Sequence, residues 1–312
     1  MRTSINITNF SWPAGRGIEA ELGAIAQQAD ASGLDTVFVS DHLVQAEPGL
    51  DPADPMLEAC TTLGYLAAHT SRVRLGMMVA SATMRPPAVL VKAVTTLDVL
   101  SGGRAWLGIG AGYNQQEADD MGFVLPPTAA RFEWLEDTLM LARQMWNGDD
   151  SAFAGHRVDA ARPIGRPLPV TAPHPPILIG GMGETKTLPL VARYADACNL
   201  PDVPDGGTLI RHKLAVLAKH CIAEGRTVDD IDKTVSTRLS RDEHADEFVE
   251  RARRLATIGV DHLVVITQGP WTTSTLAVLA EAVPAIGEIT ASPVAVHDFA
   301  GSAGASGGPT PS

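Results

Sequence analysis

The chain has 312 residues, of which 45% are hydrophobic and 19% are charged, and its formal net charge at pH 7 is −12. This composition is typical of a globular protein that is long enough to bury a sizeable core. The acidic balance argues against nucleic acid and against an anionic membrane surface as partners, because both are bound by basic protein surfaces.

The three cysteines, Cys60, Cys198 and Cys221, show no C-x-x-C spacing, and the histidines form no H-x-x-x-H pair. We therefore expect no disulfide framework and no metal site. The first residues lead directly into a predicted strand without the apolar segment of a secretory signal, and no apolar run is long enough to span a bilayer. These observations predict a cytoplasmic protein.

Short apolar segments rich in β-branched residues alternate along the chain with segments of helical period. The predicted strands are residues 4–10, 36–39, 73–79, 105–109, 177–179, 197–200, 234–240 and 260–267. The predicted helices are residues 18–32, 54–70, 87–100, 131–146, 184–195, 208–224, 245–258 and 274–289. Eight strand–helix units in strict alternation predict an α/β fold, a (β/α)8 TIM barrel, with a doubly wound sheet as the minor alternative.

Particular residues set the expected ends of these segments. Asp54 and Pro55 suit an N-cap and a first helical turn, so a helix should begin there. Pro189 fits only near the start of a helix, so the helix around it should begin late. Residues 147–176 form a loop insertion with many prolines and glycines that has room for a small hairpin. We expect one barrel domain over residues 1–290 and a disordered, low-complexity tail over residues 291–312.

In such a barrel the active site lies where strands end, so the residues after each strand are the candidates. The strand at residues 36–39 is followed by Ser40, Asp41 and His42. Histidine has an unperturbed pKa near neutrality, which suits it to proton transfer. The plainer interpretation is that Asp41 caps a turn and that His42 is an ordinary loop residue.

A glycine-rich turn at residues 180–183 lies between a predicted strand and its helix. Backbone and helix-terminal amides in such a turn can bind a phosphate, and a plain tight turn is the alternative. The turn at residues 108–112 lacks the spacing of a dinucleotide fingerprint. It allows close packing against a flat ring, or forms only a strand end. For Arg85, which follows the third strand, we favour pairing with a surface carboxylate over pairing with an acidic ligand.

Six stretches, found in a fixed order within residues 1–290, carry a resemblance to a known family. They are residues 39–42 (VSDH), 100–104 (LSGGR), 107–114 (LGIGAGYN), 175–183 (PPILIGGMG), 192–199 (ARYADACN) and 259–262 (GVDH). Together they resemble the bacterial luciferase-like superfamily, and within it the actinobacterial type that uses coenzyme F420. The resemblance implies a TIM barrel with the deazaflavin ring in its mouth.

The resemblance also implies roles for single residues. Asp41 and His42 would lie beside the deazaflavin, with His42 a candidate proton donor or acceptor. A non-prolyl cis peptide, which we place at Ser81–Ala82, would back the ring. The residues expected to flank the cofactor are Gly110, Gly112 and Asn114, and those expected at its phosphate are Gly180, Gly181, Met182 and Gly183.

The implied reaction is hydride transfer between C5 of the deazaflavin and a small-to-medium organic substrate, because the cofactor carries the hydride while the protein positions both partners. The resemblance further implies a homodimer. Two alternatives stay open at this point. One is an FMN-dependent monooxygenase on the same barrel, and the other is a non-catalytic barrel that binds a flavin.

Overall fold

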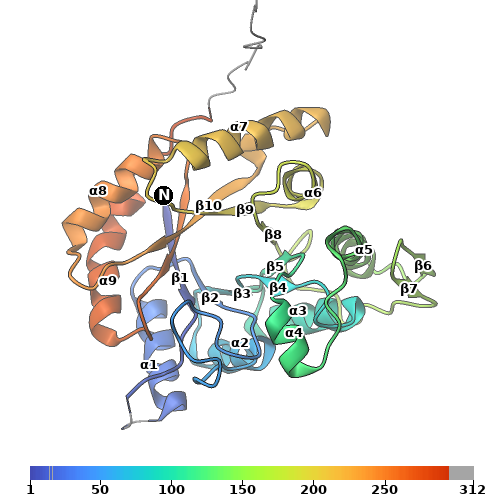
Figure 1. The fold of residues 1–312 in the computed structure, drawn as a ribbon, viewed down its shortest axis with the longest axis horizontal. Helices are drawn as coiled ribbons and strands as arrows, with labels where there is room; N and C mark the ends of the chain where they lie inside the picture. Colours follow the sequence, from blue (N-terminus) through green and yellow to red (C-terminus); the bar gives the residue numbers. More distant parts are fainter. Residues whose placement is uncertain (14, 16, 295–312) are drawn as a thin grey trace, which may run out of the picture.

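The structure is a computed structural model that describes residues 1–13, 15 and 17–294. Parallel strands occupy its centre and helices surround them (Figure 1). The strands of the main sheet are β1 (Arg2–Ile7), β2 (Thr36–Val39), β3 (Arg74–Met77), β4 (Ala80–Ser81), β5 (Leu107–Gly110), β8 (Ile177–Gly180), β9 (Ala197–Pro201), β10 (Asp232–Arg238) and β11 (His262–Ile266). They pair in the order β3-β2-β1-β11-β10-β9-β8-β5-β4.

The two ends of this sheet meet and close it. Leu75 on β3 forms a parallel bridge with Ala105, just before β5, and the Trp106 amide donates to the Leu75 carbonyl at 2.8 Å. β3 and β4 are the two halves of one barrel strand that Met78 and Val79 interrupt. The predicted (β/α)8 barrel is therefore confirmed.

The helices follow the predicted alternation, with differences at some of their ends and with one further helix, α4, in a stretch predicted to be a loop. They are α1 (Ile18–Ala31), α2 (Ala59–His69), α3 (Pro87–Ser101), α4 (Gln115–Met121), α5 (Thr128–Trp146), α6 (Thr187–Tyr194), α7 (Thr208–Ala223), α8 (Ala245–Ala256) and α9 (Thr273–Gly287), with a short 3-10 turn at Val228–Asp230. The expected start at Asp54 is wrong, because Glu58 caps α2 by accepting the amides of Cys60 and Thr61. The late start predicted from Pro189 is confirmed by α6.

The barrel interior is layered along its axis. On β1, Ile5 and Ile7 belong to the large core between sheet and helices. A second, smaller apolar cluster fills the middle of the barrel, and it consists of Phe38, Trp106, Leu178, Ala197 and Val264. Because alternate strand residues share one face, this layer lies between the residues at the strand starts and those at the strand ends. On β11, for example, His262 lies before Val264 and the cavity-lining Ile266 lies after it.

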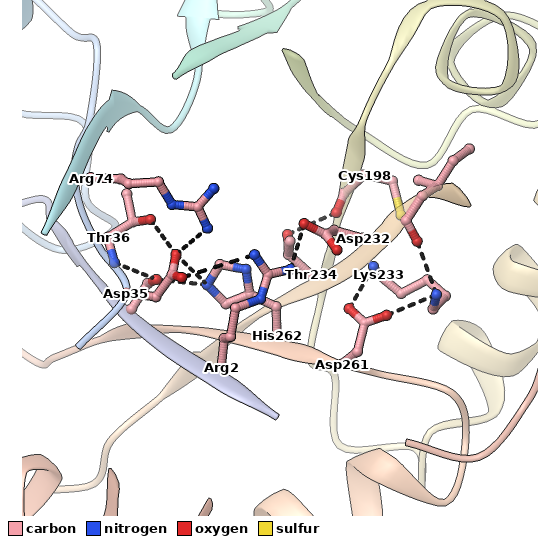
Figure 2. Close-up of polar contacts among 12 residues, drawn as sticks. Arg2, Asp35, Thr36, Arg74, Cys198, Asp232, Lys233, Thr234, Asp261 and His262 are labelled. Carbon is pink, nitrogen blue, oxygen red and sulfur yellow. Dashed lines mark hydrogen bonds and ion pairs between the residues drawn. The ribbon is translucent and has the colours of Figure 1, made fainter. Parts of the chain in front are cut away.

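Figure 2 shows the polar end of the barrel at the strand starts. His262 is fully buried there, and its Nε2 lies 2.6 Å from Ser4 Oγ. Asp35 accepts a hydrogen bond from Arg74 at 2.5 Å and lies 3.9 Å from the His262 ring. Arg2 pairs with Asp232. This end carries structural ion pairs, and the residues predicted to be functional lie at the other end.

The predicted insertion does carry a hairpin, formed by β6 (Phe153–Ala154) and β7 (Asp159–Ala160). A fully buried carboxylate, Asp137 on α5, accepts the backbone amides of His156, Arg157 and Val158 and so ties the hairpin to the barrel. Among the described residues, no helix is long and apolar enough to cross a membrane. The predicted tail at residues 291–312 falls almost wholly on 295–312, which lie outside the described residues.

Candidate functional site

A cavity of about 530 Å³ opens where the strands end. Most of the site residues expected from the sequence line it, namely Asp41, His42, Ser81, Gly110, Gly112, Asn114, Gly180 and Gly181. The expected residues that do not line it are Ala82, which is fully buried, the exposed Met182, and Gly183. The barrel therefore gathers segments far apart in sequence around one hollow.

His42 is held by a carboxylate that the sequence analysis did not identify. Its Nδ1 lies 2.8 Å from Oε2 of Glu117, and the Leu43 amide donates to the other oxygen of Glu117 at 2.5 Å. If Nδ1 donates its proton to this carboxylate, Nε2 is left as an acceptor. Nε2 lies 3.5 Å from the hydroxyl of Tyr113, whose ring meets the imidazole edge-on.

Glu117 is only 2% exposed. Burial opposes its charge, but the hydrogen bonds from His42 and from the Leu43 amide outweigh that effect and lower the pKa of Glu117 below its ordinary value. Glu117 lies on α4, and the side chain of Asn114 caps this helix by accepting the Glu117 amide at 3.1 Å. An Asn followed three residues later by Glu is a helix-start signal, and that signal could have identified α4.

Asp41 lies deeper, and its side chain has no exposed surface. Both of its oxygens accept from the Arg85 guanidinium, at 2.7 and 2.8 Å, and Arg85 also donates to Glu58 at 2.6 Å. Burial opposes the charge of Arg85, but Asp41 and Glu58 raise its pKa above the ordinary value. The sequence-based preference for a surface role of Arg85 is therefore wrong, since its main partner is a buried carboxylate of the site.

The interruption of the third strand is also placed differently from our expectation. The non-prolyl cis peptide joins Met78 to Val79, and the expected position at Ser81–Ala82 is wrong. The difference arises because β3 already ends at Met77, so that the irregular segment comes before Ser81. A side chain at Gly110 or Gly180 would come within 3.0 Å of Val79. These two glycines therefore let Val79 lie against the ends of β5 and β8.

The glycine turn after β8 packs against the start of α6. Gly181 has a φ of 121° and a side chain there would come within 3.3 Å of Thr187, while one at Gly183 would come within 3.0 Å of the Thr187 hydroxyl. Gly180, Gly181 and Thr187 line the cavity. The turn thus presents backbone and one hydroxyl to the hollow, as a phosphate-binding turn requires.

The floor of the cavity is polar. It is lined by Asn6, Ser40, Asn199 and Ser236. The Asn199 carboxamide donates to the Ser236 hydroxyl at 2.9 Å, and the Asn6 carboxamide donates to the Ser40 hydroxyl at 3.5 Å. Asn6 is 5% exposed, and its Oδ1 has no hydrogen-bond partner in the described part of the chain. A buried acceptor without a partner is costly, so this atom suits a ligand that brings a donor.

The family model for the luciferase-like monooxygenases matches residues 1–291. The chain belongs to this family.

Named members and solved structures agree with the assignment. The chain is 32% identical to an F420-dependent glucose-6-phosphate dehydrogenase from Kineococcus radiotolerans, over 77% of this chain and 69% of the relative. A solved F420-dependent secondary alcohol dehydrogenase has a TM-score of 0.77 at 15% identity, over 91% of this chain and 98% of the other. The monooxygenase RslO1 from Streptomyces bottropensis has a TM-score of 0.65 at 21% identity, over 91% and 80% of the two chains.

As a luciferase-like protein, the chain is an oxidoreductase of a family whose members use F420 or a flavin. The cavity fits such a group on its own evidence. The glycine turn can hold a phosphate, and the unpartnered oxygen of Asn6 can accept a ring N–H or a hydroxyl. No group of three His, Cys, Asp or Glu side chains in the described ranges could hold a metal ion.

Proposed function

We propose that this luciferase-like protein is a coenzyme F420-dependent oxidoreductase that transfers a hydride between the deazaflavin and a small-to-medium organic substrate. The observation that carries the proposal is the His42–Glu117 pair, whose 2.8 Å contact lies in the same cavity as the glycine turn. When bound, the cofactor supplies a carbon that accepts or releases a hydride. The F420-dependent relatives support this choice of cofactor.

The chain's own residues handle the proton. Glu117 fixes the orientation of the imidazole, and Nε2 of His42 is the nitrogen that can exchange a proton with a bound substrate. Gly180, Gly181 and Thr187 hold the cofactor phosphate. Val79, seated between Gly110 and Gly180, backs the ring. Asp41 accepts hydrogen bonds from Arg85 on both oxygens and shapes the wall beside His42.

A paired titration of the purified protein with F420 and with FMN tests the cofactor. We expect binding of F420 with a Kd in the micromolar range or below and weaker binding of FMN. Micromolar FMN binding without F420 binding would overturn the choice and favour the FMN-dependent monooxygenase.

The variant His42→Ala tests the catalytic role. We expect it to keep the wild-type affinity for F420 and to slow hydride transfer by about 10²-fold or more, the usual contribution of a general acid or base. His156→Ala is the matched control, because this histidine is exposed and lies on the hairpin. Unchanged turnover in His42→Ala would reject the role, and F420 binding without reduction by any compound of a broad panel would favour a non-catalytic barrel.

We also propose that the protein acts as a homodimer in a reducing cytoplasm, without a nucleic-acid or membrane partner. Its three cysteines are free, which suits that compartment. A groove between α2 and α3 is lined mostly by small and apolar side chains together with Lys92, and two of its lining residues, Val89 and Leu100, are 55% and 76% exposed. Light scattering coupled to size exclusion tests the dimer, with Leu100→Glu expected to yield monomers.

A further inference from the structure

We infer that the substrate is an uncharged organic molecule with an apolar body and a hydroxyl or carbonyl group at the reacting carbon. This inference rests on the proposed function and names the substrate class that its cavity takes. The inferred substrate class differs from glucose 6-phosphate, the sugar phosphate for which two relatives of the chain are named.

The charges of the cavity are the first argument. Arg238 is the single Lys or Arg among the described residues that line it, against the three carboxylates of Asp41, Glu47 and Glu117. A phosphate monoester carries nearly two negative charges at neutral pH and is usually held by several cationic or charge-assisted donors. Asp41 is already paired with Arg85 behind the lining, so Arg238 is the one cationic side chain that the described lining offers to an anion.

The one cation is also already engaged. Arg238, at the end of β10, donates to the Thr267 carbonyl and lies 3.9 Å from Glu47. Glu47 is fixed in turn, because it accepts from the Thr8 hydroxyl at 2.7 Å. An anionic substrate would have to displace Glu47 from Arg238 or lie beside an uncompensated carboxylate.

The walls supply the second argument. The loops after β2, β4 and β5 bring apolar side chains to the cavity, and these are Met56, Met84, Phe123, Leu125 and the ring of Tyr113. Methionine side chains adapt to irregular apolar shapes, and an apolar wall with few convergent polar groups selects apolar ligands. His42 lies beside this wall, with the Tyr113 hydroxyl 3.5 Å from its Nε2, so the reacting oxygen should lie at Nε2.

The chemistry then balances with the proposed cofactor alone. In the oxidation of an alcohol, the C–H bond of the carbinol carbon breaks and its electron pair leaves as a hydride to C5 of the deazaflavin. The hydroxyl proton passes to Nε2 of His42 and a carbonyl group forms. The bound deazaflavin would supply the hydride acceptor and would gain one solvent proton, and His42 returns the hydroxyl proton to solvent, so protons and electrons balance. Reduction of a carbonyl compound is the same sequence in reverse.

The test compares ligands of one shape and different charge. Cyclohexanol, cyclohexanone, cyclohexyl phosphate and glucose 6-phosphate are titrated into the F420-loaded protein, with deazaflavin fluorescence reporting binding and absorbance reporting reduction. We expect a neutral compound to bind at least about tenfold more tightly than cyclohexyl phosphate, a difference of about 1.4 kcal/mol, and glucose 6-phosphate to give no turnover. Equal or tighter binding of the phosphates, or no binding of either neutral compound, would overturn the inference.

Two variants test whether the contact between Glu47 and Arg238 causes the weak binding of phosphates. Glu47→Gln frees Arg238, so it should raise the affinity for cyclohexyl phosphate several-fold, whereas Arg238→Gln should lower it further. Glu250→Gln is the control, because that carboxylate is exposed on α8 and outside the cavity lining. An unchanged phosphate affinity in Glu47→Gln would argue against the inference.

Experiments can reject the proposed substrate class without rejecting the proposed function. An F420 titration of the wild-type protein comes first, and lack of binding rejects the proposed function. The same four compounds are also compared on the unloaded protein by thermal stabilisation, because any ligand of the folded state raises its stability. F420 binding together with a preference for phosphates would reject the substrate class alone.

Discussion

Arg85 and Asp41 form a two-point ion pair, with both carboxylate oxygens within 2.8 Å of the guanidinium nitrogens. The pair joins the tip of β2 to the segment after β4. It fixes the residue that precedes His42 while leaving the imidazole directed to Glu117. Its burial makes it sensitive to the loss of either partner.

Replacing Arg85 by Met should destabilise the fold strongly. The change leaves the fully buried Asp41 carboxylate without its counter-charge, and breaking such a pair typically costs about 3–5 kcal/mol. Urea unfolding of wild type and variant measures the difference. Arg162→Met is the control, since its pair with Asp150 is exposed and should contribute less than about 1 kcal/mol. Equal effects of the two variants would contradict the prediction.

Replacing Glu117 by Gln should slow catalysis without loosening the cofactor. Gln can still accept the Leu43 amide, but it no longer stabilises a positive charge on His42, so we expect kcat to fall by about 10²-fold. Steady-state kinetics with an accepted substrate give kcat and KM, and fluorescence titration gives the Kd of F420. Glu133→Gln on the exposed face of α5 should leave all three at the wild-type values. A change confined to KM would point to a binding role for Glu117 instead.

The glycine after β5 can be tested against a glycine of similar backbone conformation. Gly112 and Gly122 have φ values of 77° and 73°, so Ala at either position carries a backbone penalty of about 1 kcal/mol. A side chain at Gly112 would also overlap the hydroxyl of Ser81, whereas Gly122 has open space around it. We expect only Gly112→Ala to weaken F420 binding. Equal Kd values for the two variants would show that the contact between Gly112 and Ser81 does not shape the cofactor site.

Stability should depend on pH through His262. Burial lowers the pKa of this imidazole from 6.5 to about 4, and the nearby Asp35 offsets the effect only in part. Between about pH 6.5 and pH 4 the unfolded chain therefore binds more protons at this site, and stability falls as the pH falls, by up to about 3 kcal/mol in total. The variant His262→Gln should lose this component. Urea unfolding at about pH 7 and about pH 5 measures it, and an identical pH dependence in wild type and variant would refute it.

Much of the fold could be predicted because the barrel repeats one local pattern. Apolar strands of period two and helices of period 3.6 leave a clear signal, and the glycine turns mark the strand ends. α4 lacks this apolar periodicity, since its sequence QQEADDM has no apolar stripe. The helix depends instead on the Asn114 cap and on Gly122 at its end. Local rules also misplaced the start of α2, where the Glu58 side chain replaces Asp54 as the cap.

The candidate site was less accessible to sequence reasoning. The strand-end rule brought Asp41, His42 and the glycine turns to one rim, and Asp41, His42, Gly110, Gly112, Gly180 and Gly181 do line one cavity, whereas Gly183 does not. The partners that define their chemistry are distant in sequence, with Glu117 lying 75 residues from His42 and Arg85 lying 44 residues from Asp41. No local pattern encodes such pairs, because they exist only once the barrel has closed. The cis peptide was misplaced for a related reason, since the end of β3 is set by pairing with its neighbours.

The apolar layer of Phe38, Trp106, Leu178, Ala197 and Val264 lies between the two ends of the barrel. Beside this layer the Thr234 hydroxyl at the base donates to the side-chain oxygen of Asn199 at 2.9 Å, and the Asn199 carboxamide donates to the Ser236 hydroxyl at 2.9 Å, so hydrogen bonds connect the base to the cavity. Acidification at His262 should register as a loss of folded protein, because the unfolded chain takes up the proton more readily. A pH profile of activity would report the rim only where the protein is shown to remain folded.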